Sequence, residues 1–295
     1  MKIITFGSKG QLGHELVKQG NRFAFEILPF DLPEVDITNP FQVENIVSTT
    51  PATLVVNAAA YTNVDRAETE KTPAFAVNRD GPENIAQSCE RKNIPLIHIS
   101  TDYVFNGKTK YPYTEADQVS PLGVYGHSKS EGEKKIRSQI KRHIIIRTSW
   151  LYGVCGHNFV KTMLGLGNEN SRLKVVSDQF GSPTSAADLA ETVLTIGRQI
   201  QNSIKIDWGT YHYCGLGTAT WHLFAEKIFQ IAKQYTPLRI ETVEPIKTDE
   251  YPTPAERPMY SVLDCSRIEQ RLGIHPKPWE ESLHETIARM MKKGG

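Results

Sequence analysis

Short runs of β-branched residues alternate with helix-compatible segments through the first half of this 295-residue chain. The strand-like runs are Lys2–Phe6, Phe25–Phe30, Thr53–Asn57, Pro95–Ser100 and His143–Thr148, and the helical patterns are Gln11–Gln19, Phe41–Thr49, Ala74–Arg91 and about 123–139. This order predicts an α/β fold of Rossmann type, a doubly wound parallel sheet with helices on both faces. Pro29 is the weak point of the second strand, because proline cannot donate to a sheet ladder.

The second half of the chain differs from the first in its pattern of helices and connecting segments. Its helical patterns, joined by longer and proline-rich connections, are Asn158–Leu166, Ala186–Arg198, Thr220–Gln234 and Trp279–Met291. The change near residue 150 predicts a dinucleotide-binding domain over residues 1–149 and a smaller α/β substrate domain over 150–295. A short segment near 210–214 is a candidate strand that returns to the first sheet.

Charge, hydropathy and cysteine spacing exclude several classes of protein. A formal net charge of +1 argues against a strongly basic protein that binds the phosphate backbone of nucleic acid through its overall positive charge. No run approaches 18 consecutive apolar residues, so we expect no membrane span. The four cysteines form no CxxC pair, which argues against a thiolate zinc site or a disulfide framework. We therefore expect a cytoplasmic protein without a nucleic-acid or membrane partner.

A glycine-rich turn follows the first strand. Gly7, Gly10 and Gly13 stand in a GxxGxxG spacing that opens a helix, with Gln11 and Leu12 between the last two. Glycines let the backbone approach a pyrophosphate closely, and a helix N-terminus supplies free N–H groups and partial positive charge. The spacing differs from the commoner GxGxxG and is weak evidence by itself. The prediction of a phosphate-binding turn therefore depends on its location between a strand and a helix.

Further residues of the first half are candidates for the adenosine side of a dinucleotide. Asp31 lies 18 residues beyond Gly13, near the offset of a carboxylate that binds ribose hydroxyls, and so favours NADH. Small side chains at the carboxyl end of the third strand leave room for a cofactor. The candidates besides Asp31 are Asp36, Ile37, Ala59, Ala60 and Tyr61.

Tyr125 and Lys129 stand four residues apart on a predicted helix and therefore share one face. A neighbouring ammonium favours the phenolate and lowers the pKa of a phenol toward the working range. Thr101 ends the fourth strand 24 residues upstream, where a hydroxyl points into the crevice of the glycine turn. Chance alone produces Tyr-Lys pairs, so the joint order of turn, hydroxyl, phenol and amine predicts a carbonyl-reducing site. His98, His127 and His143 lack metal spacing and are interpreted as ordinary histidines.

With these residues in place, the chain resembles the extended short-chain dehydrogenase/reductase superfamily, and within it the dTDP-4-dehydrorhamnose reductases. The motifs that carry the resemblance are Phe6–Gly13, Val56–Thr62, Ser100–Phe105, Val124–Gly126 with Lys129, Arg147–Trp150, Asp178–Gly181 with Pro183 and Thr184, and Tyr251–Ala255 with Arg257 and Pro258. The motifs after residue 147 are the more specific, because they fall in the part that selects the substrate.

The resemblance implies that Tyr125 is the proton donor, Lys129 its partner and a cofactor ligand, and Thr101 the hydroxyl that orients the carbonyl. It implies hydride transfer from NADPH or NADH to C4 of dTDP-4-dehydro-L-rhamnose, a nucleotide-sugar substrate. The implied substrate-binding residues are Thr101, Asp102, Tyr103, Trp150 and Arg257.

Three questions stay open at this point. A dehydratase or epimerase of the same superfamily is an alternative, although dehydratases place an Asp-Glu pair where this chain has Asp102-Tyr103. A regulatory subunit resembling the β subunit of methionine adenosyltransferase is another. Some relatives form a homodimer around Mg²⁺ held by glutamates. Glu15 matches one ligand, but Asp188 stands at the second and no third is evident, so we expect no resident metal.

Overall fold

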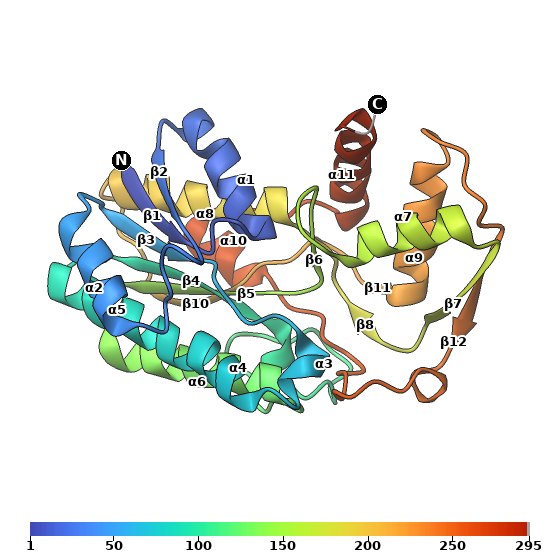
Figure 1. Cartoon of the computed structure of the whole chain (residues 1–295), viewed down its shortest axis with the longest axis horizontal. Coiled ribbons are helices and arrows are strands. Elements are labelled where there is room, and N and C mark those ends of the chain that lie inside the picture. The colour runs from blue at the N-terminus through green and yellow to red at the C-terminus, as the bar shows by residue number, and fades with distance from the viewer. Residues whose placement is uncertain (294–295) are drawn as a thin grey trace.

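The computed structural model describes residues 1–293 and is built on a six-stranded parallel sheet (Figure 1). The strand order is β10-β5-β4-β3-β1-β2. The bounds are β1 Lys2–Phe6, β2 Glu26–Phe30, β3 Leu54–Asn57, β4 Leu96–Thr101, β5 His143–Thr148 and β10 Gly209–His212. This doubly wound arrangement confirms the predicted fold class. The order turns back at β1, which pairs with both β2 and β3, so the switch point at which doubly wound sheets form a binding crevice lies between the carboxyl ends of β1 and β3.

Apolar side chains alternate between two cores across the sheet. Ile3 faces one core and Ile4 the other, and both are buried, as expected for strands covered on both sides. Pro29 is accommodated because β2 is an edge strand, where it lies opposite Thr5.

Helices cover both faces of the sheet (Figure 1). On one face lie α1 Gln11–Gly20, α8 Ala186–Gln201 and α10 Ser266–Leu272, and on the other lie α2 Pro40–Thr49, α5 Gly81–Lys92 and α6 Val124–Gln139. The helix predicted over 74–91 is interrupted. It consists of α4 Lys71–Phe75, a five-residue π-helical segment Ala76–Asp80 and α5. Such a π segment inserts an extra residue into the helix and often marks a functional site.

The second half adds a smaller unit beside the sheet, at the right of Figure 1. Its core is enclosed by α7 Phe159–Glu169, α9 Trp221–Ala232, α11 Trp279–Lys293 and the parallel pair β7 Arg172–Val176 and β12 Thr242–Ile246. The second half also contains two short strand pairs: β6 Leu151–Tyr152 with β9 Thr184–Ser185, and β8 Phe180–Gly181 with β11 Ala219–Thr220. The shorter elements are η1 Asn21–Phe23, α3 Val64–Ala67, η3 Asp102–Val104 and η4 Thr248–Glu250.

The chain crosses between the two halves more than once. Helices α8 and α10 pack on the first sheet, and β10 pairs with β5 in the region for which the sequence suggests a returning strand. The domain division near residue 150 stays a prediction. Within residues 1–293, no helix is both long and apolar enough to cross a membrane.

Candidate active site

The glycine turn lies against the end of β3, where only glycine fits. Gly7 has a φ of +79°, and a Cβ there would lie 2.4 Å from the backbone nitrogen of Ala59. A Cβ on Gly13 would lie 2.2 Å from the Gly7 carbonyl oxygen. Gly10 is the N-cap of α1 and has no side chain to cap the helix. The turn therefore presents free backbone N–H groups at the crevice, as a pyrophosphate requires.

Asp31 is brought to this same turn. Its carboxylate accepts hydrogen bonds from the backbone nitrogen of Lys9 at 2.7 Å and from that of Leu32 at 2.8 Å. The Lys9 ammonium bonds to the Leu32 carbonyl at 2.5 Å and to Glu34 at 3.0 Å. The Asp31 carboxylate and the Lys9 ammonium therefore both lie at this turn, where the adenosine ribose of a dinucleotide is expected.

The other candidates on the adenosine side have local partners. Asp36 accepts from the backbone nitrogen and the hydroxyl of Thr38 at 2.9 and 2.8 Å. The Ile37 side chain is buried in the core against Gly81, so any contact of Ile37 with a cofactor comes through its backbone.

Ala59, Ala60 and Tyr61 line the exit of β3 and are half-buried. The backbone nitrogen of Tyr61 donates to the side-chain oxygen of Asn78 at 2.9 Å. Asn78 belongs to the π-helical segment, is fully buried, and donates in turn to the Tyr61 carbonyl and to the Ser128 hydroxyl, each at 3.0 Å. It therefore ties the β3 loop to α6. Nothing in the local sequence pattern marks Asn78 for this role.

Thr101, Asp102, Tyr103 and Tyr125 gather at the carboxyl end of β4. The Thr101 hydroxyl donates to Asp102 at 3.0 Å and accepts from the backbone nitrogen of Tyr103 at 3.2 Å. The rings of Tyr103 and Tyr125 meet edge to face with centroids 5.7 Å apart. Burial raises the pKa of Tyr125 to about 12, although a hydrogen bond with Thr101 acts in the opposite direction. The phenol is therefore protonated at neutral pH and can donate a proton.

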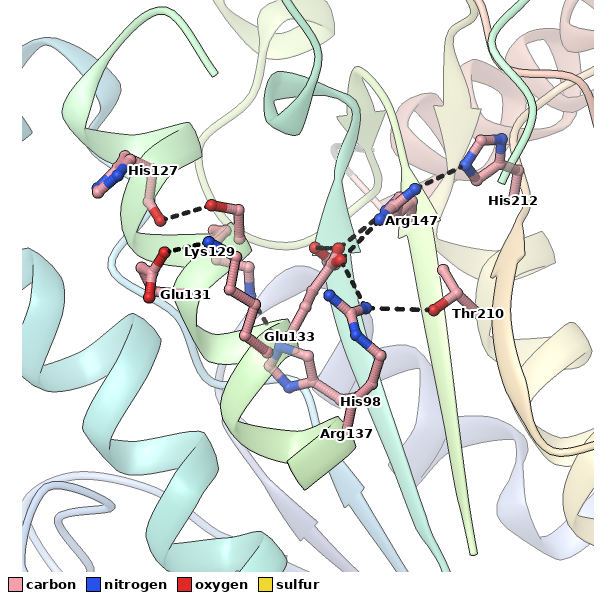
Figure 2. A network of polar contacts seen from close by, with 12 residues as sticks. His98, His127, Lys129, Glu131, Glu133, Arg137, Arg147, Thr210 and His212 are labelled. Carbon is pink, nitrogen blue, oxygen red and sulfur yellow. Dashed lines mark hydrogen bonds and ion pairs between the residues drawn. The ribbon is translucent and has the colours of Figure 1, made fainter. Parts of the chain in front are cut away.

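Lys129 shares the helix face of Tyr125, but its ammonium group contacts β4. Nζ donates to the Ile99 carbonyl at 2.6 Å and lies 3.3 Å from Nε2 of His98 (Figure 2). Burial lowers the pKa of Lys129 to about 8, while the charge of Glu133 acts to raise it. Over residues 1–293, no hydrogen bond joins Nζ to Tyr125, so the effect of Lys129 on the phenol stays a prediction.

The candidate substrate residues occupy the side that faces the smaller unit. The Trp150 ring stacks on Trp221 with centroids 3.6 Å apart. The Arg257 guanidinium lies 6.0 Å from the Tyr103 ring centre and bonds to Asp65 at 2.8 Å through Nη2. Its Nη1 is buried and has no hydrogen-bond partner among the described residues. A buried cationic donor without a partner suits an anionic or polar ligand group.

A buried ion pair holds α6 in place, and sequence patterns gave no signal for it. Glu133 accepts from Arg147 of β5 at 2.9 and 2.7 Å, from Ser100 of β4 at 2.6 Å and from Arg137 at 3.1 Å (Figure 2). Glu133 and Arg147 are 0% and 3% exposed. These hydrogen bonds therefore hold α6, the helix that carries Tyr125, against β4 and β5.

The residues that match magnesium ligands do not fit a metal in this chain. Glu15 is buried and pairs with Arg289 of α11, and it accepts a second bond from Gln19. Asp188 is bound by Lys277 and by the Ser282 hydroxyl. Both carboxylates are thus satisfied by side chains. Residues 1–293 contain no group of three or more His, Cys, Asp or Glu side chains arranged for a metal ion.

Comparison with known proteins places this geometry in a family. The family model described as the RmlD substrate binding domain matches residues 1–292. The dTDP-4-dehydrorhamnose reductase of Sinorhizobium fredii is 41% identical over 295 residues, covering 100% of this chain and 99% of that protein.

Solved structures agree. The dTDP-4-dehydrorhamnose reductase of Clostridium acetobutylicum has a TM-score of 0.91 at 40% identity, and that of Bacillus anthracis, solved in complex with NADP, has 0.90 at 38%. Each alignment covers 98% of this chain and 99% of the other. The chain therefore belongs to the RmlD substrate binding domain family, which confirms the resemblance carried by its motifs.

Proposed function

We propose that this chain reduces the C4 keto group of dTDP-4-dehydro-L-rhamnose to dTDP-L-rhamnose with NADPH or NADH. The observation that carries the proposal is that Tyr125 packs on Tyr103, next to Thr101, at the carboxyl end of β4, the edge of the parallel sheet at which the glycine turn also lies. Full-length similarity to reductases of that name supports the choice of substrate.

The chemistry assigned to the protein is proton donation and orientation. A reduced nicotinamide supplies the hydride when it is bound. The Thr101 hydroxyl donates a hydrogen bond to the carbonyl oxygen, and Tyr125 transfers its proton to that oxygen as negative charge develops on it. Because burial keeps the phenol protonated, the donor is ready at neutral pH. Without substrate the Thr101 hydroxyl donates to Asp102, whose pKa burial raises to about 6, so this hydroxyl rotates away from Asp102 when it donates to the carbonyl.

The first turn of α1 would hold the cofactor pyrophosphate through its backbone N–H groups. Asp31 suits the ribose hydroxyls of NADH, whereas the neighbouring Lys9 ammonium suits a 2′-phosphate. The NADP complex of the Bacillus anthracis relative supports use of the phosphorylated cofactor. We therefore assign both cofactors to this site.

On the substrate side, Tyr103 and Trp150 would contact the sugar, and the free Nη1 of Arg257 would donate to a polar substrate group. Asp65 holds the opposite edge of the guanidinium, so the direction of that donor is fixed before substrate arrives.

The test is a spectrophotometric assay with dTDP-4-dehydro-L-rhamnose and each reduced cofactor. Tyr125→Phe should reduce turnover by about 10²- to 10⁴-fold, the usual contribution of a positioned acid, with cofactor affinity nearly unchanged. Tyr152→Phe is the matched control, because Tyr152 is also a buried tyrosine but bonds to the Trp279 carbonyl, outside the site. Equal turnover in both variants would refute the proton-donor assignment.

The same assay separates the open alternatives. A reductase consumes the reduced nicotinamide stoichiometrically, whereas a dehydratase or epimerase regenerates it, and a regulatory subunit leaves it untouched. Cytoplasmic location and a homodimer stay predictions, which fractionation and light scattering respectively test.

A further inference from the structure

Asn57, the last residue of β3, forms a hydrogen bond with His98 of β4. The side-chain oxygen of Asn57 accepts a hydrogen bond from the backbone nitrogen of Ala59 at 3.1 Å. That bond fixes the orientation of the amide, so its NH₂ group faces Nδ1 of His98 at 3.1 Å. An amide NH₂ only donates. Nδ1 of His98 must therefore act as the acceptor.

His98 carries its single proton on the other ring nitrogen. The side chain is fully buried, and burial holds its pKa well below the ordinary range, so the ring is neutral. With Nδ1 accepting, the proton lies on Nε2. Nε2 in turn points at Nζ of Lys129, 3.3 Å away (Figure 2).

This arrangement discriminates between the two forms of Lys129. An ammonium group only donates, so one of its N–H bonds would point at the Nε2–H donor of His98, and the two donors would repel each other. An uncharged amine has one lone pair, which accepts from Nε2–H while an N–H donates to the Ile99 carbonyl at 2.6 Å. The two contacts together match the amine and not the ammonium.

We propose that His98 is a positioning residue that, through the tautomer fixed by Asn57, holds Lys129 on β4 and weakens its hold on a proton. The hydrogen-bond polarity stands on geometry alone, and its relevance to catalysis rests on the proposed function. Lys129 then exchanges a proton near neutral pH instead of remaining a permanent cation beside Tyr125.

The other charged groups near Lys129 do not account for this effect. Glu133, one turn further along α6, favours the ammonium but is already shared between Arg147 and Arg137. His143 of β5 is neutral as well, because burial lowers its pKa. Among the contacts of Nζ within residues 1–293, the Ile99 carbonyl accepts from either form, and the Nε2–H of His98 is the one that, alongside burial, opposes the charge.

The first experiment reads the tautomer of His98 in the wild-type protein. Long-range ¹H–¹⁵N correlation spectra of ¹⁵N-histidine-labelled protein, assigned with His98→Leu, distinguish a protonated Nε2 from a protonated Nδ1. We expect protonated Nε2 and bare Nδ1. A proton on Nδ1, or a charged ring at neutral pH, would overturn the proposal.

The second experiment follows the charge of Lys129 by ¹³Cε NMR of lysine-labelled protein, with the signal assigned by Lys129→Met. His98→Leu removes the opposing donor and should raise the pKa of Lys129 by about one unit. Thr5→Val is the matched control, because Thr5 is a buried strand residue whose hydroxyl has no partner among the described residues, and it should cause no shift. An unchanged or lowered pKa in His98→Leu contradicts the proposal.

Asn57→Asp tests the same point without removing the imidazole. A carboxylate accepts from Nδ1–H, which would turn the bare Nε2 toward Lys129 and raise its pKa, with the reversed tautomer visible in the same spectra. If neither change occurs, Asn57 does not set the tautomer and the proposal is wrong.

In the reductase assay, one limb of the plot of kcat/KM against pH should report the titration of Lys129. The midpoint of that limb should shift together with the pKa of Lys129 measured by NMR. The NMR readouts need no turnover. A wild-type protein without reductase activity would therefore end the proposed function and leave the assignment of His98 to be decided separately.

Discussion

Replacing Glu133 by glutamine should cost this protein about 3 kcal/mol of stability at neutral pH. Burial alone would raise the pKa of Glu133, but the hydrogen bonds and charge of Arg147, helped by Ser100 and Arg137, outweigh it and leave the pKa at about 2, against an ordinary 4.5. A drop of about 2.5 units, at about 1.4 kcal/mol per unit, corresponds to about 3 kcal/mol. The variant also leaves the Arg147 guanidinium buried and unpaired, a loss of about 3–5 kcal/mol in other buried pairs.

The pH dependence has a definite sign. Because the folded-state pKa lies below the unfolded one, the contribution of Glu133 is complete above about pH 4.5 and is lost as pH falls toward 2. The difference between wild type and Glu133→Gln should therefore shrink from about 3 kcal/mol at pH 7 to about 1.5 kcal/mol at pH 3.

Urea unfolding followed by tryptophan fluorescence at both pH values measures these differences. Glu131→Gln, on the same helix, is the control: Glu131 forms an exposed pair with Lys134 and should contribute no more than about 1 kcal/mol. If the two variants lose equal stability at pH 7, or if the Glu133→Gln deficit does not shrink in acid, the buried pair does not stabilise the fold as argued.

Two further changes test the placement of α1. Gly13→Ala should weaken cofactor binding at least tenfold in a fluorescence titration, because its Cβ would lie 2.2 Å from the Gly7 carbonyl oxygen and displace the turn; wild-type affinity would contradict this reading. Arg289→Ala should lower stability by about 1–3 kcal/mol in urea unfolding, because Glu15 then stays buried without its cation. Unchanged stability there would contradict a stabilising role of the Glu15–Arg289 pair.

Local patterns in the sequence determined much of the first half. Strand and helix periods predicted the alternating elements, since periodicity depends on near neighbours along the chain. The returning strand β10 was only a candidate, because its pairing with β5 joins residues that lie about 65 positions apart. The π-helical break at Ala76–Asp80 was missed, since helical periodicity continues through a single inserted residue.

The candidate site divides in the same way. The sequence by itself determined that a glycine turn follows the first strand and that Tyr125 and Lys129 share one helix face, because both depend on spacing within a few residues. Only the tertiary structure decided what these groups touch. Nζ of Lys129 meets His98 and the Ile99 carbonyl, about 30 residues away in the chain.

The same holds for the longest-range contact of the site. Arg257 meets Asp65 across 192 residues, and no local pattern announces such a pair. Burial and hydrogen-bond partners determine proton affinity, and both arise when distant segments pack together. The order of residues in the sequence therefore provides the chemical groups of the site. The packing of β4 against α6 determines their burial and hydrogen-bond partners, and through these their proton affinities.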